Sequence, residues 1–235
     1  MKLLTAQMKK WGRPLTSVQQ QQFEQYLALL IEWNQKINLT AIREPEQIEI
    51  RHFIDGASCS LVTGNLNGKW LIDVGTGAGF PGLPLKILFP AMELVLVDSV
   101  AKKTRFLDLV VNELDLNGVT IVTDRAEALG QNADYRARFD WAVGRGVAHL
   151  AILAEYLLPL CRTEGTMLAQ KGERAPEEMT AAARAIGILG GGTATLKEVQ
   201  LPTIERPHYL VTIPKVKKTS KRYPRPIGIP KKQPL

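Results

Sequence analysis

The chain has 235 residues, of which 45% are hydrophobic, and a formal net charge of +7 at pH 7. This composition is typical of a folded globular protein and excludes wholesale disorder, collagen-like repeats and a disulfide-rich scaffold. No apolar run predicts a transmembrane helix, and the apolar part of the first residues is too short for us to expect a signal peptide. Cys59 and Cys161 lie far apart in apolar segments, so we interpret them as buried thiols of a cytoplasmic protein rather than as metal ligands.

The sequence of the first third of the chain predicts helices. Apolar side chains recur at helical spacing from Thr16 to about Ile37, and either Thr16 or Ser17 can cap this helix. A second helix is expected from Pro45, a favoured first-turn residue, to about Leu61. A segment rich in glycine and asparagine then separates this helical extension from the rest of the chain.

The pattern after this break alternates between strands and helices. The expected strands are Trp70–Val74, Leu94–Asp98, Thr120–Thr123, Phe139–Val143 and Thr166–Gln170. The expected helices are Pro81–Leu88, Lys102–Leu114, Val147–Leu160 and Pro176–Ile188. Strands that are joined by helical segments of this length predict an α/β fold with a mainly parallel sheet covered on both faces.

The end of the chain differs from this core. Two more strands are expected at Thr195–Leu201 and His208–Ile213, and their short connection predicts an antiparallel pair at the edge of the sheet. We therefore divide the chain into a helical extension (1–64), an α/β core (65–213) and a basic, proline-rich tail (214–235). The tail has no acidic residue and eight basic ones: Lys215, Lys217, Lys218, Lys221, Arg222, Arg225, Lys231 and Lys232. Such a tail predicts a polyanionic partner, although it would equally serve as a solubilising end.

The strongest local signal is the segment from Leu71 to Gly82, in which a hydrophobic strand runs into Gly75, Gly77 and Gly79. Glycines at alternate positions let the backbone approach a ligand closely, and they cost backbone entropy that a plain turn would not need. In an open parallel sheet, ligands bind beyond the carboxyl ends of the strands. The segment therefore predicts a binding site at this edge of the sheet, with a plain glycine turn as the alternative.

Two carboxylates help to define the ligand. Asp98 ends the next predicted strand, where a carboxylate can accept hydrogen bonds from both hydroxyls of a ribose. Gly77, Gly79 and Gly82 also fit a dinucleotide fingerprint, so a nicotinamide cofactor is an alternative. Asp73 argues against it, because a carboxylate here repels a diphosphate and suits a cationic ligand such as a sulfonium that carries an ammonium group.

Further motifs follow the same order as those of a known family. They are Trp33-Asn34 with Asn38-Leu39-Thr40, Arg51-His52-Phe53 with Asp55, the run from Asp73 to Gly82, Asp98-Ser99 with Lys102-Lys103 and Arg105-Phe106-Leu107, Arg145-Gly146, Lys171-Gly172, and Tyr223-Pro224-Arg225 with Gly228-Ile229-Pro230. This set resembles the class I S-adenosylmethionine-dependent methyltransferases and, more narrowly, the bacterial small-subunit (16S) rRNA guanine-N7 methyltransferase family, also called the glucose-inhibited division protein B family. The likeness covers nearly the whole chain, with Gly56 standing where the family pattern has serine.

The resemblance implies a Rossmann-like core that transfers a methyl group from S-adenosyl-L-methionine to N7 of a guanine in the 530 loop of 16S rRNA. It also implies cofactor contacts at Gly75, Phe80, Asp98, Ser99, Val100, Ala126, Glu127 and Arg145, in addition to Asp73, Gly77 and Gly79 in the loop. By the same likeness, Phe80 lies beside the methionine moiety, and Ala126 and Glu127 lie near the adenine.

The residues are consistent with this reaction. Guanine N7 has a free lone pair and no proton to remove, so the enzyme needs no general base. Arg145 follows the fourth strand, where its guanidinium can hold a phosphate, a cofactor carboxylate or the Hoogsteen edge of the guanine. The predicted RNA-binding residues are Arg125, Lys171, Lys217, Lys218, Lys221, Arg222 and Arg225. Taken singly, Arg125 and Lys171 are better interpreted as ordinary surface charge, and together with the tail they predict a continuous basic surface.

His52 and Asp55 share one face of a predicted helix. They form either an ordinary surface ion pair or part of an RNA entrance above the cofactor cleft. We expect His149 and His208 to have structural roles.

Three classes of function remain open from the residues alone. A methyltransferase of 16S rRNA or another RNA binds S-adenosylhomocysteine and incorporates methyl groups. A nicotinamide-dependent oxidoreductase binds NAD instead, and a non-catalytic RNA-binding module binds RNA without methyl transfer. We expect the first, as a monomer with 16S rRNA or the 30S subunit as its partner and with neither a metal nor a membrane.

Overall fold

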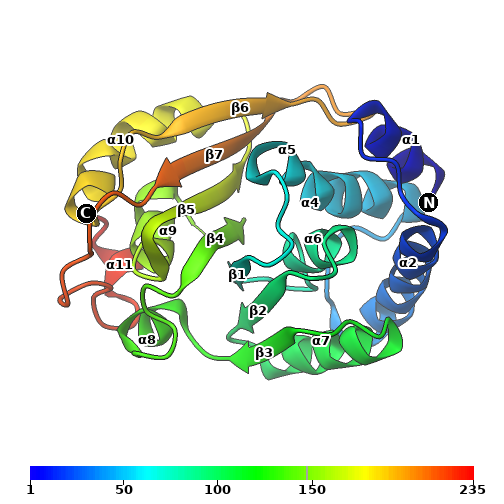
Figure 1. The fold of residues 1–235 in the computed structure, drawn as a ribbon, viewed down its shortest axis with the longest axis horizontal. Helices are drawn as coiled ribbons and strands as arrows, with labels where there is room; N and C mark the ends of the chain where they lie inside the picture. The colour runs from blue at the N-terminus through cyan, green and yellow to red at the C-terminus, as the bar shows by residue number, and fades with distance from the viewer. Residues whose placement is uncertain (147) are drawn as a thin grey trace.

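The computed structural model describes residues 1–146 and 148–235. In this part of the chain one sheet has the strand order β3-β2-β1-β4-β5-β7-β6, with helices on both faces (Figure 1). The strands are β1 (Trp70–Val74), β2 (Glu93–Asp98), β3 (Val119–Thr123), β4 (Phe139–Arg145), β5 (Cys161–Lys171), β6 (Thr195–Val199) and β7 (His208–Pro214). The strands from β1 to β5 pair in parallel, whereas β7 is antiparallel to β5 and β6 is antiparallel to β7. The predicted α/β sheet with an antiparallel C-terminal pair is confirmed.

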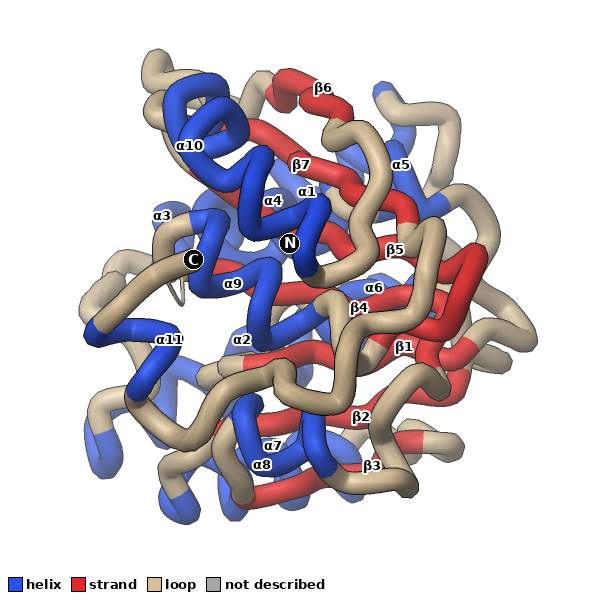
Figure 2. The backbone as a smooth tube through the Cα atoms, turned by 90° about the vertical axis from the view of Figure 1, so that its left-hand side faces the viewer, coloured by secondary structure: helices blue, strands red, loops and turns tan. Residues whose placement is uncertain are grey.

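Helices cover the sheet on both sides (Figure 2). They are α1 (Lys2–Lys10), α2 (Ser17–Ile37), α3 (Pro45–Ile48), η1 (Glu49–Ile54), α4 (Asp55–Ser58), α5 (Ser60–Thr63), α6 (Gly82–Leu88), α7 (Ala101–Glu113), α8 (Ala126–Gln131), α9 (Leu150–Leu157), α10 (Ala175–Ile188) and α11 (Ile229–Lys232). The sequence did not predict α1, α8 or α11. The expected start of a helix at residue 147 lies outside the described residues.

The extension is helical for the reasons that the sequence indicates. Thr16 caps α2 by accepting a hydrogen bond from the amide of Gln19, whose side chain accepts one from the Thr16 amide. This reciprocal pair satisfies two amides that an uncapped helix leaves without partners. The second expected helix is not one regular helix, because the π-helical turn η1 interrupts it. Such wide turns are frequent at functional sites, and this one carries His52.

The sheet separates two apolar cores. On one face, Phe23 of α2 and Phe53 of η1 pack with Leu83 of α6, and all three side chains are fully buried. On the other face, Leu153 of α9 and Ala182 of α10 are buried against the sheet. The extension is thus continuous with the core of the sheet. Burial on both faces leaves the carboxyl ends of β1, β2 and β4 as the edge at which a ligand can enter.

The basic C-terminal segment is not a free tail. Figure 1 shows it folded back beside α8 and α9. The guanidinium of Arg136 donates to the carbonyls of Tyr223, at 2.7 Å, and Thr219, at 2.9 Å. The Tyr223 side chain is buried, as is Lys215, whose ammonium donates to the carbonyl of Leu189. The segment therefore forms part of the folded unit.

None of the described helices is both long enough and apolar enough to cross a bilayer.

Candidate active site

The glycine loop after β1 is built on Asp73. This residue is fully buried, and its Oδ2 accepts hydrogen bonds from the Gly82 amide at 2.8 Å and the Thr76 hydroxyl at 2.7 Å. Its Oδ1 is buried without a partner among the described residues. Burial raises the pKa of Asp73 to about 6. Asp73 thus ties both ends of the loop together and keeps one acceptor free beneath it.

Two of the predicted glycines serve different purposes. Gly77 has a φ of +63° and open space where a Cβ would lie, so the loop can approach a ligand there. Gly79 instead lies beneath the loop, where the side chains of Leu83 and Tyr26 fill the place of a Cβ. The Tyr26 hydroxyl also donates to the carbonyl of Ala78. The loop is therefore open to a ligand at Gly77, and at Gly79 it is packed against the side chains of Leu83 and Tyr26.

Asp98 ends β2 next to this loop. Its Oδ2 accepts a hydrogen bond from the Gly77 amide, and its Oδ1 accepts one from the Val100 amide, each at 3.0 Å. The ammonium of Lys103 lies 3.5 Å from Oδ2. Each carboxylate oxygen can accept two hydrogen bonds, so Asp98 is oriented by the backbone and still has free lone pairs.

Two cavities meet at Gly75. The smaller, of about 170 Å³, lies beyond the ends of β2 and β3; we call it the adenosine-side cavity. Its lining includes Gly75, Asp98, Ser99, Asp124, Arg125, Ala126, Glu127, Tyr156 and Lys231. The predicted residues Asp98, Ser99, Ala126 and Glu127 are thus brought together. Val100 lines neither cavity and is 37% exposed.

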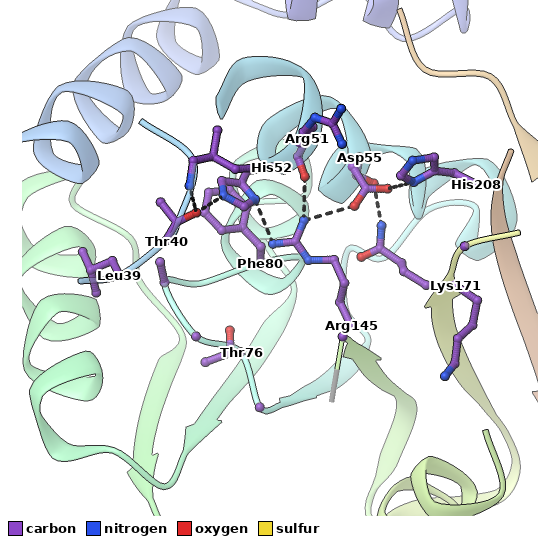
Figure 3. Close-up of a pocket in the computed structure, with 17 residues that line it drawn as sticks. Leu39, Thr40, Arg51, His52, Asp55, Thr76, Phe80, Arg145, Lys171 and His208 are labelled. Carbon is purple, nitrogen blue, oxygen red and sulfur yellow. Dashed lines mark hydrogen bonds and ion pairs between the residues drawn. The ribbon is translucent and has the colours of Figure 1, made fainter. Parts of the chain in front are cut away.

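The larger cavity, of about 480 Å³, lies between the glycine loop, β4, β5 and the extension; we call it the acceptor-side cavity. Figure 3 shows the side chains that line it. Its lining includes Thr40, His52, Asp55, Gly75, Gly77, Phe80, Arg145, Gln170, Lys171 and His208. Residues from six separate segments of the chain therefore line this cavity.

Arg145 is the centre of this wall. Its Nη1 donates to Oδ2 of Asp55 at 3.0 Å and to the carbonyl of Arg51 at 2.9 Å. Its Nη2 lies 3.2 Å from Nδ1 of His52, and its guanidinium lies 5.2 Å above the centre of the Phe80 ring (Figure 3). Asp55 is buried, so the predicted His52 and Asp55 face is part of the cavity and not an exposed helix surface. The guanidinium plane is held by the extension, since three of its contacts come from one helical turn.

His52 is held in its neutral form. Burial, with the nearby charge of Arg145 as a second cause, lowers the pKa of His52 to about 4. Because Nδ1 faces a guanidinium donor, the ring proton is assigned to Nε2, which donates to the Thr40 hydroxyl at 2.7 Å. The Thr40 oxygen also accepts from the Ile42 amide, so the hydroxyl hydrogen of Thr40 is left for another acceptor.

Phe80 lies between aromatic groups. Tyr26 stacks on it at a centroid distance of 5.3 Å, and His52 stacks on it at 5.0 Å. Phe80 is 2% exposed, yet its ring contributes to the lining of the acceptor-side cavity. The stack gives this cavity a flat, rigid apolar wall.

The predicted RNA-binding cations fall into two groups. Lys171 is paired with Glu178 at 2.7 Å, and Arg225 donates to both oxygens of Glu155, so their charges are already matched inside the chain. Arg125, Lys217, Lys218, Lys221 and Arg222 are exposed. Only this second group presents charge to a partner.

The sequence interpretation missed several residues of the cavities. His208, for which we predicted a structural role, lines the acceptor-side cavity and lies 3.7 Å from Oδ1 of Asp55. Gln170 donates to the carbonyl of Asp55 at 2.8 Å, and its buried Oε1 has no partner among the described residues. Position at a strand end was the available signal for both, since His208 begins β7 and Gln170 lies near the end of β5. His149, in contrast, is exposed beside Glu178.

The sheet order, the glycine loop after β1 and the acid at the end of β2 define a class I methyltransferase fold. Solved structures agree on this fold. A single-residue mutant of the 16S rRNA (adenine(1408)-N(1))-methyltransferase from Catenulisporales acidiphilia superposes with a TM-score of 0.54 at 14% identity, covering 66% of this chain and 88% of that one. A predicted O-methyltransferase from Agrobacterium tumefaciens gives 0.56 at 15% identity, covering 70% and 82%.

Sequence comparison is more specific. The model of the GidB family, described as rRNA small subunit methyltransferase G, matches residues 19–206. The ribosomal RNA small subunit methyltransferase G of Roseiflexus sp. (strain RS-1) is 45% identical over the full length of both chains. The protein of the same name from Lactobacillus johnsonii is 42% identical, over 99% of this chain and 98% of its own. The chain belongs to the rRNA small subunit methyltransferase G family.

Proposed function

We propose that this protein transfers a methyl group from S-adenosyl-L-methionine to N7 of a guanine in 16S rRNA. The observation that carries the proposal is the pair of cavities that meet at Gly75, one beside the ribose-binding position of Asp98 and one beside Arg145. Family membership supplies the substrate class. The particular guanine, in the 530 loop, rests on the family resemblance of the motifs.

The residues present fit the cofactor. Asp73 has a buried acceptor without a partner among the described residues, and a bound ammonium group would offset the burial that raises its pKa. Asp98 keeps free lone pairs for two ribose hydroxyls. Gly77 leaves open space where a side chain would block the approach of a ligand. We propose that Gly75, Ser99, Ala126 and Glu127 surround the adenosine part and Phe80 the methionine part.

When bound, S-adenosylmethionine supplies the electrophilic methyl group. The task of the chain is then to orient guanine N7 and to exclude water, since N7 carries no proton. Arg145 is held rigidly at the wall of the acceptor-side cavity, where it can donate to the guanine O6 and leave N7 free. The Thr40 hydroxyl is a second donor, and Oε1 of Gln170, which has no partner among the residues that the structure describes, is an acceptor for a base N–H group. No side chain has to act as a general base.

The RNA backbone requires exposed positive charge on the protein surface. Arg125 lines the adenosine-side cavity, whereas Lys217 and Lys218 follow β7 at the opposite edge of the sheet. We propose that Arg125, Lys217, Lys218, Lys221 and Arg222 contact phosphates, since they are exposed. Lys171 and Arg225 are left out of this surface because each is paired with a carboxylate of the chain. We further propose that the protein acts in the cytoplasm, as a monomer.

A methyl-transfer assay tests the function. The protein is given methyl-labelled S-adenosylmethionine and 30S subunits from cells that lack this activity, and the label is mapped by cleavage at N7-methylguanine. We expect label at a single guanine of 16S rRNA. Label on another RNA would show that the substrate is not 16S rRNA. Binding of the cofactor without methyl transfer would favour a non-catalytic RNA-binding role. Binding of NAD in place of S-adenosylhomocysteine would indicate an oxidoreductase.

A further inference from the structure

The adenosine-side cavity has one lining residue from the far end of the sequence. Most of its lining comes from the end of β1, the end of β2 with Ser99 after it, and the segment after β3. Lys231 of α11 lines the same cavity, about a hundred residues beyond Glu127 along the chain. The basic C-terminal segment therefore reaches the site that we propose for the cofactor.

The segment is anchored directly at the cavity wall. The amide of Gly228 donates to Oε1 of Glu127 at 3.0 Å. Glu127 is 5% exposed, so the loss of this contact would leave a buried carboxylate without one of its donors. A residue expected beside the adenine thus also fixes the start of α11.

A second anchor lies behind the cavity. Arg225 donates through its amide and its guanidinium to Glu155, whose side chain is 1% exposed. Gln131 donates to the carbonyl of Pro224 at 2.7 Å, and Pro230 is buried. Releasing the segment would leave Glu155 as an uncompensated buried charge, so α11 is a fixed wall and not a mobile end.

We infer that α11 is part of the cofactor site and that Lys231 binds the adenosine moiety of S-adenosylmethionine. Lys231 is exposed, and its ammonium has no hydrogen bond or ion pair within residues 1–146 and 148–235. An adenosine offers acceptors at its ring nitrogens and ribose oxygens, which suit an ammonium donor at the rim of a cavity with acidic residues on its other walls. The inference rests on the proposed function, because it names a further residue for the same ligand.

Calorimetry with S-adenosylhomocysteine tests this inference without any RNA. Lys231→Ala is expected to weaken binding at least threefold. Lys232→Ala is the matched control, because it removes the same charge from the next position of α11, outside the cavity lining. The control is expected to bind like the wild type. Lys231→Met keeps the length of the side chain, so a loss with this variant assigns the effect to the ammonium group.

Two failures are distinguishable. If the wild type binds S-adenosylhomocysteine and both alanine variants bind it equally well, the role of Lys231 is overturned and the proposed function stands. If the wild type does not bind S-adenosylhomocysteine at all, the proposed function itself fails. Equal losses for Lys231→Ala and Lys232→Ala would assign the effect to general charge and also overturn the inference.

Discussion

Nη2 of Arg145 lies 3.2 Å from Nδ1 of His52, although the two residues are 93 positions apart in the sequence. Arg145 ends β4 in the sheet, whereas His52 lies on the π-helical turn of the extension. Asp55, the first residue of α4, accepts from the other arm of the same guanidinium. The helical extension therefore orients the side chain of Arg145, which lies at the end of β4 and lines the acceptor-side cavity.

Replacing Arg145 by lysine tests this arrangement. A lysine has one terminal nitrogen and cannot contact Asp55 and His52 together, so the methyl-transfer rate should fall at least tenfold. The affinity for S-adenosylhomocysteine should change by less than about threefold. Arg138→Lys, an exposed position just before the start of β4, is the control and should keep full activity. If Arg145→Lys instead loses affinity for S-adenosylhomocysteine and keeps its methyl-transfer rate, Arg145 binds the cofactor and does not orient the guanine.

Replacing Asp98 by alanine should weaken the binding of S-adenosylhomocysteine. Hydrogen bonds to a charged group contribute about 1.5–3 kcal/mol, so the loss should be on the order of tenfold or more. Asp108→Ala removes an exposed carboxylate of α7 and is the control for the change in charge. Unchanged affinity of the Asp98 variant in calorimetry would remove Asp98 from the site.

The exposed lysines of the C-terminal segment should control the salt dependence of RNA binding. Each lost phosphate contact lowers the slope of log affinity against log salt by about 0.7–0.9. Lys217, Lys218 and Lys221 changed together to glutamine should lower that slope by about 2. The same change at Lys2, Lys9 and Lys10, exposed on α1, should leave it unaltered. Equal slopes for the two triple variants would contradict the proposed RNA surface.

The pairing of Arg225 with Glu155 should contribute to stability. Arg225→Ala leaves the buried carboxylate with a backbone amide as its remaining partner, so the free energy of unfolding should fall by about 3 kcal/mol. Lys36→Ala breaks the exposed pair with Glu32 and should cost less than about 1 kcal/mol. Urea denaturation measures both losses, and similar small values would mean that the Glu155 pair is no stronger than a surface pair.

His52 should make stability depend on pH. Its pKa is about 4 in the folded state and about 6.5 when unfolded, so between these values the unfolded chain binds the extra proton. The free energy of unfolding of the wild type should therefore fall, relative to that of His52→Asn, as the pH drops from 6.5 to 4. The relative loss should be on the order of 2–3 kcal/mol.

The comparison with His52→Asn removes other sources of pH dependence. Asp73 titrates in the same range with the opposite slope, because its pKa is raised, but it is present in both proteins. A difference between the wild type and His52→Asn that does not vary with pH would contradict the neutral, buried state of His52.

Local patterns in the sequence were sufficient for most of the fold and placed the glycine loop and Asp98 at one edge of the sheet. Hydrophobic runs located the central strands, which are buried on both faces, and period-3.6 spacing located the long helices, which bury one face each. The glycine loop and Asp98 are close along the chain and sit at adjacent strand ends, so their joint role followed from the order of the strands. The sequence also predicted the N-cap of α2, because a capping box is formed within four consecutive residues, here Thr16 to Gln19.

Tertiary structure alone decided the rest. Nothing local to Arg225 or Lys171 indicates that a carboxylate lies beside it, so the sequence counted both as free cations. The partners of Arg145 lie about ninety residues away, and Lys231 reaches the cavity only because Glu155 and Glu127 hold the C-terminal segment against the core. Long-range charge pairing and burial depend on how the chain folds back on itself, and no periodicity of the sequence records that.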